Sequence, residues 1–482
     1  MKRLYSPLTL AIVGALISAL LLASPNGPLW AASILMLPTA VWLLGGRRAH
    51  PVLEWLIGLN WLQIAGDVLG ADLSDQTLAE GWMGRYREQA IFFSLCAVLA
   101  MALGMRVGTR LGGRAFGASA LPVVEARRGV DIYRIVGAYF VFLALAQALS
   151  SAAGVVPSLT QPILALALIK FVCIYLVAAK VFASERGYQW VLLILILELS
   201  MGFVGFFARY KEAAFVMLIC VAATRGTTTI RKWVFAGTTI ILVIWMSLVW
   251  TVIKNDYRYQ IISNPLEQRI EWLAERLFGN TIDYRDAVIR LVQRVGYTEL
   301  YAQLLARIDI GSTPKNLARY SAALEHVLTP RVLFPDKPRL DDSKVTRSLL
   351  GIEISDDTSI GIGFIAEAHL DFGFPALLVP LFLLGVMIGG AAQYFMTRPA
   401  PLAVREAFMT ATLFLSFQFE TNIDKALGGF ITACLAMALV LRFGYPSIAR
   451  WLAGARVQRR RIPGALRTGA PLNIAGFGSA VT

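Results

Sequence analysis

Charged residues are scarce in this chain of 482 residues: Asp, Glu, Lys and Arg make up 16% of positions, and hydrophobic residues make up 57%. Soluble domains carry about 25% charged residues, so the composition excludes an ordinary soluble domain and indicates a membrane protein. About twelve apolar runs approach the roughly 20 residues that a spanning helix needs. They begin near Pro7, Leu29, Val52, Gln89, Tyr133, Pro162, Trp190, Lys211, Trp233, Pro375, Glu406 and Leu427.

Cysteine is also rare. The four cysteines all lie inside predicted spans and show no paired spacing, which predicts neither a disulfide framework nor a zinc site. A cysteine-dependent membrane protease is disfavoured for the same reason. These residues are Cys96, Cys173, Cys220 and Cys434.

A cleavage signal is missing after the first apolar run. Lys2 and Arg3 precede that run, but Pro25 to Pro28 has no small-x-small pattern, so we expect an uncleaved first span. If the N-terminus is cytoplasmic, the basic residues of the short loops and of the tail fall on the cytoplasmic side. We therefore expect twelve spans, with both termini in the cytoplasm. The residues that carry this pattern include Arg47, Arg48, Arg106, Arg110, Arg127, Arg128, Arg225, Arg398, Arg405 and Arg459.

The formal net charge of +14 does not indicate nucleic-acid binding. The basic residues are scattered through short cytoplasmic loops and a tail, where anionic lipid headgroups attract them. Membrane lipid is therefore the expected partner of this charge.

The distribution of acidic residues divides the chain. Residues 254–372 contain 17 of its 31 acidic residues and 15 of its 45 basic residues. We expect four parts: an N-terminal transmembrane bundle of about nine spans (1–253), a large folded extracytoplasmic loop (254–372), about three C-terminal spans (373–443) and a basic cytoplasmic tail (444–482).

Four amphipathic helices are predicted in the first part of the loop. One begins at Asn264-Pro265, whose residues suit a helix N-terminus. The others run from about Ile282 to Val295 and from Thr298 to Ile308, and a fourth begins at Thr313-Pro314. Helices that lie on the membrane surface or cap the bundle would account for this pattern without any chemistry.

The stretch PRVLFPDKPRLDD (Pro330 to Asp342) follows, and its prolines exclude regular helix and stiffen the backbone. Three titratable side chains, those of Glu367, His369 and Asp371, then precede the apolar run from Pro375.

These segments resemble a known family. The F-P-D-K-P of Phe334 to Pro338, the T-S-x-G-x-G-F-x-A-E of Thr358 to Glu367 and the D-F-G of Asp371 to Gly373 are similar to the signature of bacterial O-antigen and exopolysaccharide repeat-unit polymerases (Wzy-like). The A-R-Y-K-E of Ala208 to Glu212 resembles a short basic element of the same proteins. The match covers roughly fifty residues, together with the arrangement of many spans around one large late loop.

The resemblance implies an all-α polytopic membrane protein of the GT-C-like kind in the bacterial inner membrane. It implies a glycosyltransferase that joins oligosaccharide repeat units carried on undecaprenyl pyrophosphate, without a cofactor or a metal ion. A flippase and a chain-length regulator of the same pathway are the implied protein partners.

Such a reaction needs cations for the departing pyrophosphate and a base or oriented acceptor for the attacking hydroxyl. Glu367, inside the matched motif, is the first candidate for the base and His369 the second. The candidate substrate-binding cations are Arg209, Lys211, Arg258, Arg331, Lys337 and Arg339.

Alternatives remain at this level. Arg209 and Lys211 could be interfacial residues at a tight turn. A ligase that transfers a finished glycan to another acceptor uses the same reaction type. A transporter or flippase would also have about twelve spans, but no repeat between two halves is visible. The ionisable residues inside predicted spans, which include Glu54, Asp67, Lys170 and Lys180, should face the bundle interior or an interface.

Overall fold

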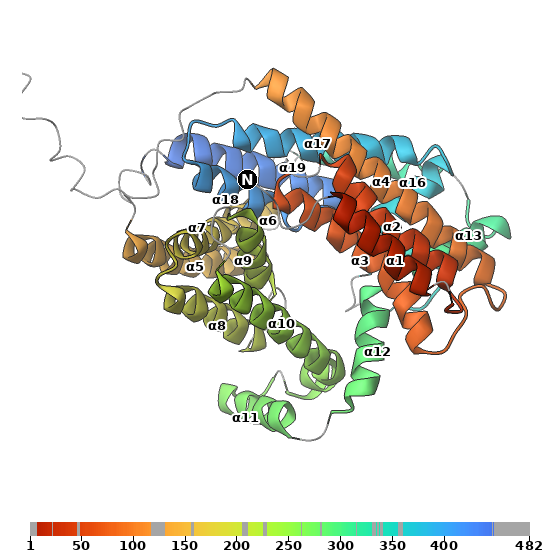
Figure 1. Ribbon diagram of the computed structural model, residues 1–482, viewed down its shortest axis with the longest axis horizontal. Helices are drawn as coiled ribbons and strands as arrows, with labels where there is room; N and C mark the ends of the chain where they lie inside the picture. Colours follow the sequence, from red (N-terminus) through yellow and green to blue (C-terminus); the bar gives the residue numbers. More distant parts are fainter. Residues whose placement is uncertain are drawn as a thin grey trace, which may run out of the picture.

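The computed structural model describes residues 7–21, 23–45, 49–116, 131–155, 159–204, 211–224, 229–261, 263–279, 282–314, 316–329, 334, 337, 341–354, 360–445 and 447. Every regular element in these ranges is helical (Figure 1). This confirms the all-α expectation for the described part of the chain.

Among the described residues, seven helical segments are long and apolar enough to cross a membrane. They are α3 (Pro51–Leu73), α4 (Gly84–Ala115), α5 (Ile132–Val155, counted from Ile132 to Ser151), α6 with α7 (Thr160–Ala167 and Ile169–Ser184), α10 (Ile230–Asp256), α17 (Leu378–Met396) and α19 (Ile423–Leu439), which continues to Gly444. The shorter apolar helices are α1 (Pro7–Leu21), α2 (Gly27–Leu43), α8 (Tyr188–Val204), α9 (Glu212–Ala223) and α18 (Leu402–Leu413). Each predicted apolar run therefore contains a helix.

The predicted run from Glu406 is not one continuous helix, which corrects the sequence interpretation. Helix α18 ends at Leu413, and residues 414–422 form a non-helical connection to α19. This connection is rich in polar residues, because Ser416, Gln418 and Glu420 alternate with aromatic ones. We call it the α18–α19 loop.

The described residues between α10 and α17 form six α-helices: α11 (Leu266–Phe278), α12 (Tyr284–Val295), α13 (Thr298–Asp309), α14 (Arg319–Leu328), α15 (Asp342–Leu350) and α16 (Phe364–Phe372). The first three agree with the predicted helices. The fourth starts at Arg319, so the start predicted at Thr313-Pro314 is wrong. Asn316 and Ala318 adopt left-handed backbone angles (φ 60° and 54°) that interrupt a right-handed helix.

Helices α4 and α17 pack side by side through glycine on both surfaces (Figure 1). A Cβ added at Gly104 or Gly108 would lie 2.1 Å from a backbone carbonyl oxygen of α17. Gly385 and Gly389 face carbonyl oxygens of α4 in the same way, at 2.2 and 2.1 Å. The two G-x-x-x-G patterns allow the backbones to touch, which is a common way to associate membrane helices.

Two of the ionisable residues in the predicted spans, Lys170 and Asp67, have partners within the protein. The Lys170 ammonium lies 2.8 Å from the buried Glu198 carboxylate, which also accepts a hydrogen bond of 3.0 Å from the Tyr139 hydroxyl. Asp67 on α3 accepts hydrogen bonds from the backbone N–H and the hydroxyl of Thr298 at 2.5 and 2.6 Å. Asp67 thus caps the N-terminus of α13.

Candidate functional site

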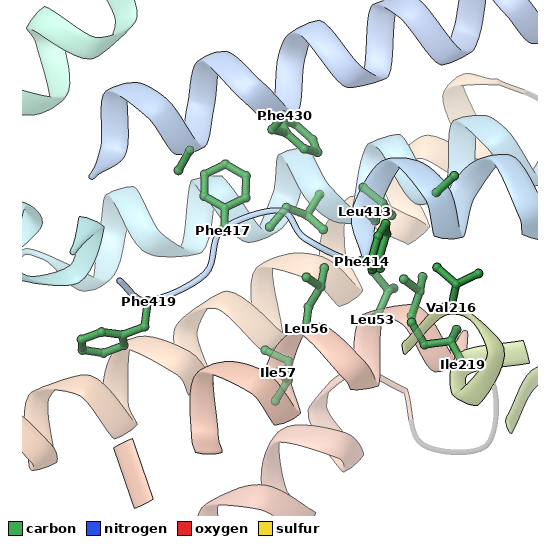
Figure 2. Close-up of a cluster of buried hydrophobic side chains, with 14 of the residues drawn as sticks. Leu53, Leu56, Ile57, Val216, Ile219, Leu413, Phe414, Phe417, Phe419 and Phe430 are labelled. Carbon is green, nitrogen blue, oxygen red and sulfur yellow. The ribbon is translucent and has the colours of Figure 1, made fainter. Parts of the chain in front are cut away.

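The α18–α19 loop is buried against α3 and α9. Phe414, Phe417 and Phe419 are at most 2% exposed. Figure 2 shows them among side chains that include Leu56 of α3 and Phe430 of α19. Burial of so much aromatic surface holds a segment without regular structure inside the bundle.

Two polar side chains of α3 satisfy the backbone of this loop. The Asn60 amide donates to the Phe417 carbonyl at 3.0 Å, and Gln63 Oε1 accepts from the Phe419 N–H at 3.1 Å. Phe417 has φ 52°, a left-handed conformation that is unusual for a bulky residue. Contacts from α3 therefore fix a strained loop within the helical bundle.

The glycines of the matched motif lie against the same loop. A Cβ at Gly363 would approach the Phe419 carbonyl oxygen to 2.3 Å, and one at Gly361 would approach Asn422 Oδ1 to 2.5 Å. Gly363 also has φ 90°, which favours glycine. The two glycines thus allow the segment before α16 to touch the α18–α19 loop.

Glu367 lies at the centre of a buried ion-pair network. Its side chain is fully buried, and one carboxylate oxygen lies 2.7 Å from the guanidinium of Arg319 on α14. The other oxygen accepts a hydrogen bond of 2.6 Å from the backbone N–H of Ile423, the first residue of α19. Arg319 also contacts Asp424 at 3.4 Å. Glu367 therefore connects α14 to the N-terminus of α19.

A second ion pair extends the network across Asn422. Lys425 lies 2.6 Å from the buried carboxylate of Asp342, which begins α15. The Asn422 amide donates to Asp342 at 3.3 Å, and its oxygen accepts from the Gly363 N–H at 3.3 Å. Three loop-region helices, α14, α15 and α16, are thus joined to the first turn of α19.

Burial changes the acidity of the central carboxyl group. Removal from water raises the pKa of Glu367 from 4.5 to about 7, although Arg319 and the Ile423 N–H oppose this shift by stabilising the charged form. The group can therefore take up a proton near neutral pH. However, both of its oxygens are occupied, so its geometry favours a positioning role over proton transfer with a substrate.

The other motif residues also make structural contacts. Asp371 accepts a hydrogen bond of 2.8 Å from the Tyr320 N–H in the first turn of α14. The Tyr320 hydroxyl donates to the Phe364 carbonyl at 2.8 Å. The residues that carry the resemblance thus hold α16 against α14.

His369 lies on the opposite side of α16 from Glu367. Its Nδ1 is 2.9 Å from the hydroxyl of the buried Tyr301, and its ring stacks on Phe93 of α4 with centroids 5.5 Å apart. The structure therefore does not bring Glu367 and His369 to one point, because residues two apart on a helix face different directions.

A second group of charged side chains comes from several elements. Lys211, Arg294 and Glu420 are exposed. Lys211 interacts electrostatically with both of the others. Gln63 donates to the Glu420 carboxylate at 3.5 Å. We call Lys211, Arg294 and Glu420 the exposed charged cluster.

Tyr297 connects this cluster to the buried network. Its hydroxyl donates to the Gly361 carbonyl at 2.5 Å, and its ring lies 6.1 Å from that of Phe419. It also interacts electrostatically with both Glu420 and Asp342. The segment from Gly361 to Gly363 thus contacts Tyr297 through Gly361 and Asn422 of the buried network through Gly363.

The predicted cations are found in different places. Lys211 belongs to the exposed charged cluster. The Lys337 ammonium donates to the carbonyls of His326 and Thr329, at 2.8 Å for Thr329, and so caps the C-terminus of α14. Arg258 lies in a π-helical turn (Tyr257–Ile261) that continues α10. Arg209, Arg331 and Arg339 lie outside the described residues.

Sequence reasoning missed Arg319, Asp342, Asp424 and Lys425 as members of one network, and Arg294 and Glu420 as members of another. Glu420, Asp424 and Lys425 carried a signal, because ionisable residues between two apolar runs are costly unless they have a function or a partner. Arg319 carried none, because its partner Glu367 is 48 residues away.

No group of three or more His, Cys, Asp or Glu side chains in the described part of the chain is arranged to hold a metal ion. The candidate site therefore consists of ion pairs, amides and tyrosines around the α18–α19 loop. No family model, curated protein or solved structure matches the chain.

Proposed function

We propose that the protein is a membrane glycosyltransferase that polymerises oligosaccharide repeat units linked to undecaprenyl pyrophosphate. In this proposal it acts at the outer face of the bacterial inner membrane and makes O-antigen, capsule or exopolysaccharide. The proposed topology has twelve helical crossings of the membrane, with both termini in the cytoplasm. The observation that carries the proposal is the exposed charged cluster, beside a segment of the polymerase-like motif.

The cluster has the two chemical capacities that the reaction needs. Lys211 and Arg294 can bind oxygens of the departing pyrophosphate, Arg294 with its planar fork and Lys211 as a point charge. Glu420 is an exposed carboxylate beside them, so it can accept a hydrogen bond, and then the proton, from the attacking sugar hydroxyl. Glu420 thus replaces the buried Glu367 as the candidate base.

The buried network has a supporting role in this proposal. Arg319, Glu367 and Lys425 fix the loop-region helices to the N-terminus of α19, which begins where the α18–α19 loop ends. Glu420 lies on that loop. A movement of α19 would therefore displace the proposed base, and a small displacement has a large effect on rate.

The test begins with a strain that lacks the protein. We expect this strain to accumulate single repeat units, whereas loss of a ligase would leave long chains on the carrier and loss of a flippase would retain the repeat unit in the cytoplasm. Long polymer in the deletion strain would exclude a polymerase.

Variants then test the cluster in the same strain. Glu420→Gln should reduce chain extension by roughly 10²–10⁴-fold, the usual contribution of a general base. Arg294→Ala should also reduce it, at unchanged protein levels. Arg290→Ala is the matched control, because Arg290 is an exposed arginine one turn earlier on α12 that pairs with Asp286. Equal chain lengths in the Arg294 and Arg290 variants would remove Arg294 from the site.

A further inference from the structure

Helix α14 carries an apolar stripe that no described residue covers. Leu324 and Leu328 are 52% and 78% exposed and lie one turn apart. Phe334, just beyond the helix, is 51% exposed. Ser321 lies on the same face as Leu328, two turns earlier. Ala322 and Glu325 occupy the neighbouring exposed face, and Tyr320, Ala323 and Val327 face the protein. The helix therefore has a packed face, an apolar exposed face and a polar exposed face.

The position of α14 relative to two candidate spans sets its depth. Val327 lies beside Gly428 of α19, 3.7 Å from where a Cβ would be, and Gln161 of α6 lies beside the same glycine at 3.6 Å. Gln161 is the second residue of the candidate span from Thr160 to Ser184. The C-terminal turn of α14 is thus next to the first turn of α6 and the second turn of α19.

Gly428 lies at the edge of the apolar part of α19. The last charged residue before the apolar stretch is Lys425, and Gly428 follows it by three residues, or about 4.5 Å along the axis. If α19 crosses the bilayer, this level is the boundary between headgroups and acyl chains. Leu324, Leu328 and Phe334 would then be exposed at a depth where lipid, not water, is the neighbour.

We propose that α14 inserts into the leaflet at the N-terminal end of α19, with Leu324, Leu328 and Phe334 in contact with lipid acyl chains.

The contact of Lys337 makes this insertion possible. The last carbonyls of a helix have no partner within the helix, and in a lipid environment water cannot replace one. Lys337 donates to the carbonyls of His326 and Thr329, and its positive charge suits the C-terminal end of the helix dipole. The Lys337 N–H in turn donates to the Phe334 carbonyl at 3.2 Å, which places Phe334 beside the end of α14.

The proposal is independent of the glycosyltransferase function and is tested without an activity assay. Single cysteines replace Leu324, Leu328, Ala322 and Glu325 in a variant whose four native cysteines are alanine. The nitroxide-labelled proteins are reconstituted in vesicles of phosphatidylethanolamine and phosphatidylglycerol. Labels at Leu324→Cys and Leu328→Cys should relax faster with oxygen than with a water-soluble nickel chelate. Labels at Ala322→Cys and Glu325→Cys, on the neighbouring face of the same helix, should show the reverse.

A second readout covers the case in which the cysteine-free variant does not fold. In the native background, a membrane-impermeant maleimide should modify Ala322→Cys and Glu325→Cys quickly, and Leu324→Cys and Leu328→Cys slowly. Equal accessibility to nickel at all four positions would overturn the proposal. Spin–spin coupling between labels at Leu328→Cys would also overturn it, because the stripe would then be covered by a second copy of the chain.

Lys337→Met should abolish the oxygen preference at Leu328→Cys, because the end of α14 would lose its cap and leave the lipid. Lys344→Met, at an exposed lysine of α15, should leave that preference unchanged. An unchanged preference in the Lys337 variant would show that its two hydrogen bonds do not hold the helix end in the leaflet.

Discussion

Several carboxylates in this protein cap helices from which they are distant in sequence. Asp67 accepts from the first amide of α13, Asp371 from the second amide of α14, and Glu367 from the first amide of α19. A carboxylate at a helix N-terminus satisfies an unpaired N–H and stabilises the positive end of the helix dipole. At the residue scale, the acidic side chains of the bundle thus determine where helices begin.

The raised pKa of Glu367 predicts a pH effect on stability. The Glu367 carboxyl group has a pKa of about 7 in the folded protein and its ordinary value of 4.5 in the unfolded chain. Between these values the folded state binds more protons, so stability falls as the pH rises from about 4.5 to 7, by an order of 3 kcal/mol. Glu367→Gln removes this contribution. The melting temperature of the wild type in detergent should therefore fall from pH 5 to pH 8 by more than that of Glu367→Gln.

Glu325→Gln, an exposed carboxylate on α14, is the control and should follow the wild type at every pH. If the melting curves of Glu367→Gln and wild type stay parallel across this range, Glu367 does not change its protonation in the folded protein.

At the scale of elements, the contact between α4 and α17 is the clearest case of packing dictated by residue size. Gly389 has a carbonyl oxygen 2.1 Å from its would-be Cβ, whereas its neighbour Gly390 has no atom within 4 Å. Gly389→Ala should therefore separate the two helices and cost about 2 kcal/mol or more. Gly390→Ala should be neutral or slightly stabilising, because alanine is the better helix former.

The melting temperatures of Gly389→Ala and Gly390→Ala, measured in the same detergent, compare their stabilities. A Gly389→Ala protein as stable as Gly390→Ala would mean that the backbones of α4 and α17 are not in contact.

The sequence predicted the elements better than their interruptions. The apolar runs and the helices α11 to α13 follow from periodicity and length, which depend on local residues. The loop that replaces the run from Glu406 depends on Asn60 and Gln63, and the left-handed residues before α14 depend on their tertiary contacts. Neither could be predicted locally, because the stabilising partners are distant in the chain.

At the scale of the whole molecule, the proposed topology predicts the side on which each segment lies. Alkaline phosphatase fused after Gly311, between α13 and α14, should be active, and a fluorescent protein fused after Gly444 should be fluorescent. Activity of the phosphatase requires export, and fluorescence of the second reporter requires the cytoplasm. An inactive phosphatase after Gly311, or a fluorescent protein that stays dark after Gly444, would place that site on the other side of the membrane and contradict the proposed topology.

The candidate site, like the interrupted helices, depends on contacts between residues that are distant in the chain. The resemblance pointed to Glu367, but the sequence could not show that Glu367 is buried or that Glu420 and Arg294 both lie within electrostatic range of Lys211. These facts depend on how α3, α9, α12 and the α18–α19 loop assemble.

The bonds from α3 to the α18–α19 loop also determine the order in which the protein can mature. Asn60 and Gln63 are synthesised more than 350 residues before Phe417 and Phe419. Until the α18–α19 loop has been synthesised, the amides of these two side chains must bind other partners or water. The final helices, made as a separate chain, lack the groups that satisfy their loop, so they should become resistant to protease only when the N-terminal bundle is supplied with them.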